Sequence, residues 1–371
     1  MERWIILISM FLGFAAFRTF LLKREPSETA SGAIVMALGI FVNGAAYRFP
    51  LHETWGPIYT VGLFLIWLLI MSSFGKNAFH RQLKAKHMND PIQFFALGTW
   101  IAGTSVCGIA IAMNIPEWGW LAWGMAVIAV LLWIYYLVKS IVHFQAIWNP
   151  DLSRKVHGII LLPAVSTQSL VLLFKTLCGD LVPNWLMAAV IAFGALLYAI
   201  GLMLIIRRFA LSRPWNIADE WPNTNCILHG AMSITGLASA VSGAVPPNVI
   251  VVIWFWVLLW FLVVESVECL RAVFRIKRYG LTRGIGIYNV SQWSRNFTFG
   301  MLYAFTFYMD LSQTAFAQVR ALHTLKSAIM DYGAWVVLAL LVNECLLFFK
   351  AKLRWEKRLL PTEINGQSRG I

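Results

Sequence analysis

Five apolar stretches of the sequence are built largely of small residues and contain glycine, serine, threonine or asparagine. Near residue 225, His229, Ser233 and Gly236 follow one another at i, i+4 and i+7, which places them on one face. Such dipoles could contact an anion without trapping it, and conduction requires binding weak enough to permit exit. Small residues also let membrane helices pack closely, which is the alternative interpretation. The candidate lining residues are Gly39, Asn43, Gly103, Thr104, Ser105, Pro163, Ser166, Ser169, His229, Ser233, Gly236, Asn296 and Thr298.

The fifth stretch opens with "WSRNFTFGML", in which Phe297 and Phe299 flank Thr298 and precede Gly300. A ring beside a glycine can swing, because glycine leaves space and loosens the helix locally. In a passage lined with small residues, one such ring could block the route. The pattern therefore makes Phe297, Phe299 and Gly300 a candidate gate, with lipid contact or ordinary packing of the rings as the alternative.

Composition places these stretches in a membrane protein. Of 371 residues, 59% are apolar and 13% are charged, whereas soluble domains carry about 25% charged residues. Mean hydropathy is +0.70. The five cysteines form no CxxC or Cys/His pattern, and neither an HExxH motif nor an intramembrane acid/base pair is present. We therefore expect no catalytic residues, no enzyme activity, no metal and no cofactor.

The apolar segments alternate between two kinds. Leading segments are small and mildly polar, as in "HGAMSITGLASAVSGA", and their partners are bulky, as in "VIVVIWFWVLLWFLVV". Trp and Tyr in the partners suit lipid and interfacial contact. The sequence therefore predicts five helical hairpins, or ten transmembrane helices, with Pro163 interrupting the backbone hydrogen bonds of one leading helix. The marked segments are 4–22, 32–48, 57–74, 92–113, 118–138, 157–175, 185–206, 225–245, 248–270, 290–309 and 331–349.

Charge in the connections predicts orientation. Lysine and arginine collect in alternate loops and in the tail, whereas "NIPEW" and "VPPN" have none, so the basic loops and the C-terminus should be cytoplasmic. The net charge of +13 then reflects topology, and no nucleic-acid partner is expected. We divide the chain into an extra N-terminal segment with a basic linker (1–30), a ten-helix domain (31–350) and a cytoplasmic basic tail (351–371). Segment 4–22 is either an additional spanning helix or an interfacial one.

The chain resembles the tellurite-resistance/dicarboxylate transporter family, which includes plant slow anion channels, bacterial TehA-like proteins and fungal malate and sulfite transporters. The stretches that carry the resemblance are "SGAIVMALGI", "DPIQFFALGTWIAGTS", "HGAMSITGLASA" and "WSRNFTFGMLYAFT". The resemblance implies an all-α membrane fold with five inner and five outer helices in a pseudo-fivefold ring around a central pore. It also implies a small anionic substrate, such as malate or an inorganic anion, a homotrimer, and a place in the plasma membrane.

The resemblance also bears on the gate. The pore-blocking phenylalanine of the family follows a tryptophan by four residues, and four residues after Trp293 is Phe297. The family commonly has Gly or Pro directly after that ring, whereas this chain has Thr298 there and its glycine two residues later. Phe297 is therefore favoured over Phe299 as the gate, and both residues remain candidates.

Two ionisable residues support a rival mechanism. Glu344 lies within the last apolar segment and His229 begins the fourth leading segment. An ionisable group at membrane depth is a functional candidate, so a proton-coupled dicarboxylate or sulfite carrier on the same scaffold is the alternative. Structural hydrogen bonding of Glu344 and end-of-helix packing of His229 are the other interpretations.

Overall fold

A computed structural model describes residues 27–50, 52–211 and 216–359 of the chain. The described residues form helices and connecting turns, and this part of the chain contains no strand. The expected extra segment 4–22 lies outside the described residues. Besides the principal helices named below, there are short helices α4 (Leu83–His87), α7 (Pro150–Ser153) and α10 (Ile217–Glu220), and 3-10 turns η2 (Ala45–Arg48), η4 (Pro116–Trp118) and η6 (Gly179–Leu181).

Five short helices pack in a closed cycle. Helix α2 packs against α5, α5 against α8, α8 against α11, α11 against α13, and α13 against α2. We call these five the cycle helices. Their bounds are α2 (Gly32–Val42), α5 (Gly98–Asn114), α8 (Leu162–Cys178), α11 (Ile227–Ser242) and α13 (Trp293–Tyr308).

Each cycle helix begins directly after a 3-10 turn. These starting turns are η1 (Thr29–Ser31), η3 (Gln93–Leu97), η5 (Gly158–Leu161), η7 (Asn223–Cys226) and η8 (Val290–Gln292). In η8 the Asn289 side chain accepts from the Ser291 N–H, and the Gln292 side chain accepts from the Asn289 N–H, which forms a capping box. The N-terminal ends of the cycle helices are thus extended by one tighter turn.

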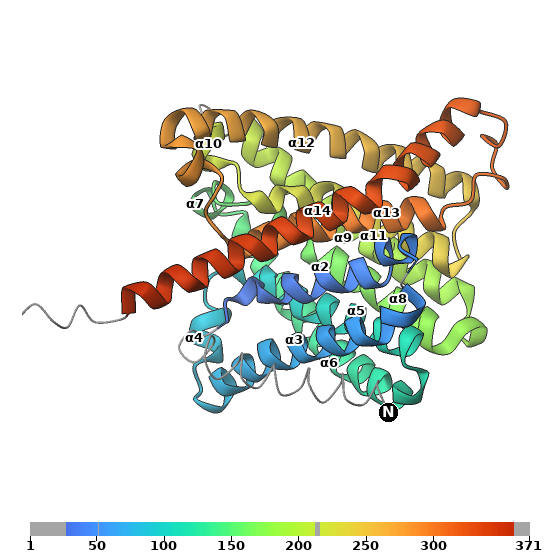
Figure 1. Ribbon diagram of the computed structural model, residues 1–371, viewed down its shortest axis with the longest axis horizontal. Helices are drawn as coiled ribbons and strands as arrows, with labels where there is room; N and C mark the ends of the chain where they lie inside the picture. The colour runs from blue at the N-terminus through green and yellow to red at the C-terminus, as the bar shows by residue number, and fades with distance from the viewer. Residues whose placement is uncertain (1–26, 51, 212–215, 360–371) are drawn as a thin grey trace, which may run out of the picture.

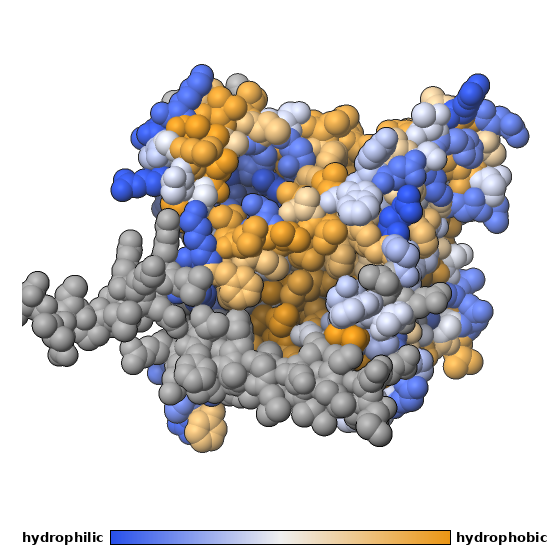
Figure 2. Space-filling model, viewed as in Figure 1, coloured by the Kyte–Doolittle hydropathy of each residue, from blue (hydrophilic) through white to orange (hydrophobic). Residues whose placement is uncertain are grey.

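Five long helices accompany the cycle, and we call them the peripheral helices. Apolar windows in the spans that contain α2, α5 and α8 are 72–100% buried, whereas those of the peripheral helices are 22–39% buried. Figure 2 shows apolar side chains across the middle of one face, with polar side chains toward its left and right edges. The expected division into enclosed small-residue helices and bulky lipid-facing helices agrees with this burial. The peripheral helices are α3 (His52–Phe79), α6 (Gly119–Ile147), α9 (Asn184–Leu211), α12 (Pro247–Gly284) and α14 (Arg320–Leu359).

Eight helical spans in the described residues are long and apolar enough to cross a membrane. Several peripheral helices extend beyond the predicted apolar segments. Helix α12 continues through the basic residues after 270 to Gly284, with a kink at Gly280 where φ is +74°, and it lies along the upper edge of Figure 1. Arg271, Arg275 and Arg278 are therefore helical residues and do not lie in a loop.

Candidate functional site

The candidate glycines lie where cycle helices meet. A Cβ added to Gly39 would clash with Val106 on α5, and one added to Gly236 would clash with the Phe305 ring on α13. A Cβ on Gly300 would lie 2.6 Å from Ile40 on α2, and one on Gly103 would lie 3.1 Å from the Gly32 carbonyl oxygen. These four glycines allow close helix contact, as small residues do in membrane proteins.

The candidate hydroxyls are already hydrogen-bonded to the backbone of their own helices. Ser105, for example, donates to the Ile101 carbonyl at 2.9 Å, and Ser233 donates to the His229 carbonyl at 2.8 Å. A hydroxyl has a single hydrogen to donate, so each of these groups presents only lone pairs to its other neighbours. Donors for an anion would have to come from elsewhere. The same backbone bonding holds for Thr104, Ser166, Ser169 and Thr298, and the Ser169 hydroxyl also lies 3.3 Å from Ser105 Oγ on α5.

Pro163 and the two asparagines take different places. Pro163 lies in the first turn of α8, where its missing N–H has no intrahelical partner to lose, so the expectation that it interrupts the helix was wrong. Asn43 donates from Nδ2 to the Val106 carbonyl at 3.0 Å, while its Oδ1 is buried without a hydrogen-bond partner. Asn296 is buried.

Phe299 lies against a peripheral helix. Its ring centroid is 5.1 Å from that of Phe261 on α12 and 6.2 Å from that of His229 on α11, both edge to face. It also packs against a small cluster of Ala45, Tyr303, Ala334 and Val337, the last two of which belong to α14. The Phe299 side of α13 therefore faces the α12 and α14 layer.

Contacts of the neighbouring residues define the remaining sides of α13. Thr298 packs against Gly230 on α11, and Gly300 packs against Ile40 on α2. At 100° per residue, the side that faces neither these helices nor the peripheral layer carries Phe297 and Met301, one turn apart. Both side chains are buried, with Phe297 2% exposed.

A partly buried charge cluster joins α13 to α12. Arg295 Nη2 lies 2.5 Å from Glu268 Oε1, and its Nε lies 3.7 Å from Glu265 Oε2. Arg271 contacts the same Glu268 at 2.7 Å, and His229 Nε2 lies 3.5 Å from Glu265. Neither His229 nor these Arg295 nitrogens make aligned hydrogen bonds, so the attraction between Arg295 and the two carboxylates is mainly electrostatic. Glu265 and Glu268 of α12 thus both face Arg295, which lies on a cycle helix.

A cavity of about 660 Å³ lies at the starts of all five cycle helices. We call it the entrance cavity. Each starting turn contributes to its lining through one or more of Thr29, Gln93, Ile159, Thr224 and Ser291. The charged or titratable side chains around it are Glu28, Lys86, His87, Asp90 and His157.

Both histidines of the entrance cavity are held in hydrogen bonds. His157 Nδ1 is 2.7 Å from the Thr224 hydroxyl, and burial together with the Arg208 charge lowers the pKa of His157 to about 4. His87 is hydrogen-bonded to Thr29 Oγ1 at 2.9 Å, and burial, followed by the nearby Lys86, lowers its pKa. Both imidazoles are therefore neutral at pH 7.

The carboxylate of Asp90 serves a helix start. Its Oδ1 accepts the N–H groups of Ile92 and Gln93 at 2.8 and 2.9 Å, at the beginning of η3. These bonds spread its negative charge onto backbone donors. Glu28 is exposed and Lys86 donates to Asn77 Oδ1 at 3.2 Å.

Glu344 lies on α14 and is not among the residues that line the entrance cavity. Its side chain is 4% exposed, and Oε1 has no hydrogen-bond partner. The five cysteines are free, and no group of three or more metal-ligating side chains was found among the described residues.

Sequence reasoning missed two features of this site. Arg295 is a lone cation in the apolar fifth leading segment, and its partners Glu265 and Glu268 have the i, i+3 spacing of one helical face. That pairing was the available signal. The starting turns carry polar residues such as Thr29 and Thr224, but nothing in their spacing indicates that they meet.

An enclosed helical core surrounded by long apolar helices defines a multi-pass membrane protein. A family model described as voltage-dependent anion channel matches residues 28–346. The chain therefore belongs to the voltage-dependent anion channel (SLAC1) family, which confirms the resemblance seen in the sequence. The family consists of transporters and channels, and membership implies transport of anions across a membrane. A comparison with curated proteins gave no match.

Proposed function

We propose that residues 31–350 form a pseudo-fivefold ring of ten helices whose central route conducts small anions and is occluded by Phe297. The observation that carries the proposal is the meeting of all five cycle-helix starts at one cavity. The substrate would be a C4-dicarboxylate such as malate, or an inorganic anion of the kind handled in tellurite resistance. The route opens from the entrance cavity and runs between the cycle helices.

Backbone dipoles supply the attraction for an anion. A helix N-terminus carries a partial positive charge worth about 0.3–1 kcal/mol to a nearby anion at low ionic strength. The start of η3 is already occupied by the Asp90 carboxylate, so the other four ends would together contribute about 1.2–4 kcal/mol. Because the histidines are neutral and the hydroxyls donate to their own helices, the attraction contains no strong fixed site. Weak and distributed attraction is what exit requires.

The contacts of α13 support Phe297 as the occluding ring. Thr298 and Gly300 face the adjacent cycle helices and Phe299 faces α12, which leaves Phe297 on the remaining side. A buried apolar ring on that side would keep the route narrow and dry. Arg295, two residues earlier, would hold the rotation of α13 through its pairing with Glu268.

Charge and family membership support a proposal for the cellular arrangement. Basic residues near the entrance cavity and in the tail support a cytoplasmic entrance and a cytoplasmic C-terminus. We propose a plasma-membrane location and a homotrimer, with peripheral helices in contact with lipid or with the other protomers.

Flux into proteoliposomes tests the proposal. Labelled malate, sulfite, nitrate and chloride would each be measured with and without an imposed potential, beside empty liposomes. We expect potential-driven uptake of at least one anion and none of a labelled cation. Uptake at the level of empty liposomes for every anion, in both wild type and Phe297→Ala, would contradict it.

A proton-coupled carrier is the second candidate, favoured by the buried, unpaired Oε1 of Glu344. An ionisable group in the membrane is a common part of proton relays. Uptake would then depend on a pH gradient in the wild type and lose that dependence in Glu344→Gln. Gradient dependence that survives in this variant would exclude Glu344 as the coupling group.

A further inference from the structure

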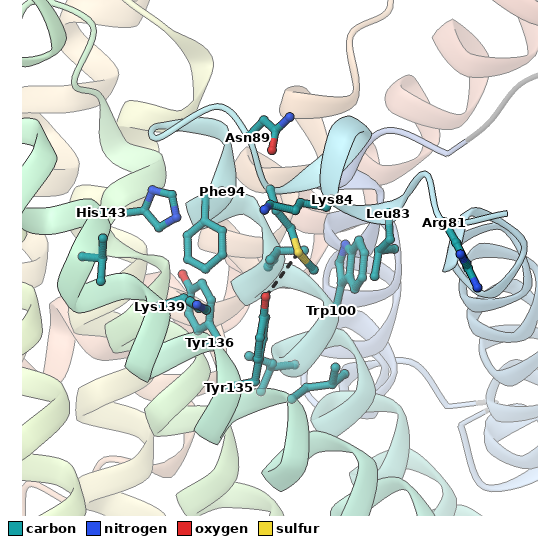
Figure 3. Close-up of a pocket in the computed structure, with 15 residues that line it drawn as sticks. Arg81, Leu83, Lys84, Asn89, Phe94, Trp100, Tyr135, Tyr136, Lys139 and His143 are labelled. Atoms are coloured by element: carbon teal, nitrogen blue, oxygen red, sulfur yellow. Dashed lines mark hydrogen bonds between the residues drawn. The ribbon is translucent and has the colours of Figure 1, made fainter. Parts of the chain in front are cut away.

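A second cavity, of about 900 Å³, lies outside the cycle, between α4, the start of α5 and the far end of α6. We call it the peripheral pocket. Arg81, Lys84 and Lys139 contribute its basic side chains, and its walls are otherwise largely aromatic and aliphatic. Figure 3 shows Lys84 and Lys139 beside the aromatic group, with Arg81 apart from them.

The floor of the peripheral pocket is a fixed aromatic assembly. Phe94 stacks on His143 with ring centroids 4.0 Å apart, and it also stacks on Tyr136 at 5.6 Å. Tyr136 donates to the Phe95 carbonyl at 2.8 Å, and Tyr135 donates to Met88 Sδ at 3.3 Å, the dashed line in Figure 3. These contacts tie α6 to the segment around η3, so the pocket is a formed feature of the fold.

With Gly119 at the opposite membrane surface, the length of α6 would place the pocket at the depth of a lipid headgroup. Lys139 comes 20 residues after Gly119, the first residue of α6, or about 30 Å along the helix, which is the thickness of the hydrocarbon core. Leu132 lines the pocket two turns deeper. A ligand that fills the pocket would meet ammonium groups at the membrane surface and apolar walls toward the bilayer interior.

The basic side chains of the pocket have no acidic partners. Lys84 and Lys139 are exposed, and within the described ranges no ion pair joins them or Arg81 to a carboxylate. Residues 1–26, which are apolar and could be considered as an occupant, contain four basic and two acidic residues and so match a basic pocket poorly. An anionic group with an attached apolar chain matches both parts.

We propose that the peripheral pocket binds an anionic phospholipid, with the phosphate between Lys84 and Lys139 and an acyl chain along Leu132. The site is separate from the proposed anion route and does not depend on it. Charge-assisted contacts to the phosphate select for anionic lipid over zwitterionic lipid.

Native mass spectrometry of the full chain, titrated with phosphatidylglycerol or phosphatidylcholine, tests the proposal. We expect the wild type to prefer phosphatidylglycerol, and Lys84→Gln/Lys139→Gln to lose roughly tenfold of that preference, since each basic contact near the surface contributes measurably to anionic-lipid binding. Lys76→Gln/Lys155→Gln removes two exposed basic residues outside the pocket and is the matched control. It should retain the preference within about twofold.

A third variant separates lipid from free phosphate. Leu132→Trp keeps every charge but fills the space for the acyl chain, so it should also weaken phosphatidylglycerol binding. Inorganic phosphate and glycerol phosphate should not displace the lipid at equal concentration. Equal losses in the control, displacement by soluble phosphate, or the same weak binding of both lipids by wild type and all variants would each overturn the proposal.

Discussion

Replacing Phe297, which faces neither α11 nor α2, gives the sharpest test of the proposed gate. Phe297→Ala removes roughly 100 Å³ of side chain, which is room for about three water molecules. If the ring occludes a route, water and anions enter that space. Each lowering of the barrier to anion passage by 1.36 kcal/mol raises the rate about tenfold. A barrier lowered by about 1.4–2.7 kcal/mol would therefore raise anion flux about 10- to 100-fold.

Stability supplies the second readout for this variant. A buried Phe→Ala change in a packed core costs about 3–5 kcal/mol, but a space that water can fill costs less. Phe297→Ala should therefore raise flux with a small loss of apparent thermal stability in nanodiscs. Phe299→Ala is the control, because Phe299 packs on Phe261, and it should lose stability without gaining flux. Equal flux gains in both variants, or a large stability loss with unchanged flux in Phe297→Ala, would refute the assignment.

Three further changes probe the entrance cavity and the charge cluster. Glu28→Gln removes an exposed carboxylate from the lining of the entrance cavity. Initial anion flux at low salt should therefore rise severalfold, and this gain should shrink at high salt. A fall in flux would contradict an anion entrance at this cavity. The folded-state pKa of His157 is about 4, below the 6.5 of an unfolded histidine, so its contribution to stability is complete above pH 6.5 and is lost as the pH falls toward 4. In His157→Asn, melting temperatures recorded across this window should depend less on pH, and an unchanged slope would argue against His157. Glu268→Gln leaves Arg295 without its closest carboxylate, which should cost about 3–5 kcal/mol and appear as an early melting transition, whereas Glu220→Gln should melt like the wild type.

Much of the architecture could be predicted because each helix carries a local signature. The small-residue segments are enclosed and the tryptophan-rich segments are exposed, since close contact needs glycine and lipid contact tolerates bulk. The length of α12 could not be predicted from hydropathy. Its basic residues continue as helix to Gly284, where apolar content no longer marks the boundary.

The site was harder to predict because its bonds depend on direction and on distant partners. Ser105 and Ser233 were placed on candidate lining faces, but a spacing argument says nothing of the carbonyl to which each hydroxyl donates. The pairing of Arg295 with Glu268 joins residues on two different helices. The Pro163 prediction was wrong because the start of α8 lies closer to the proline than the apolar segment indicated.

The close glycine contacts around the cycle have a mechanical consequence. At Gly39, Gly236 and Gly300 the neighbouring helices already touch through side chains that leave no space for a Cβ. Widening the central route by moving the cycle helices apart would therefore break several of these helix contacts at once. Rotation of a single aromatic ring disturbs none of them. A protein that opens in this way keeps its cross-sectional area in the bilayer, and membrane tension has no area change on which to act.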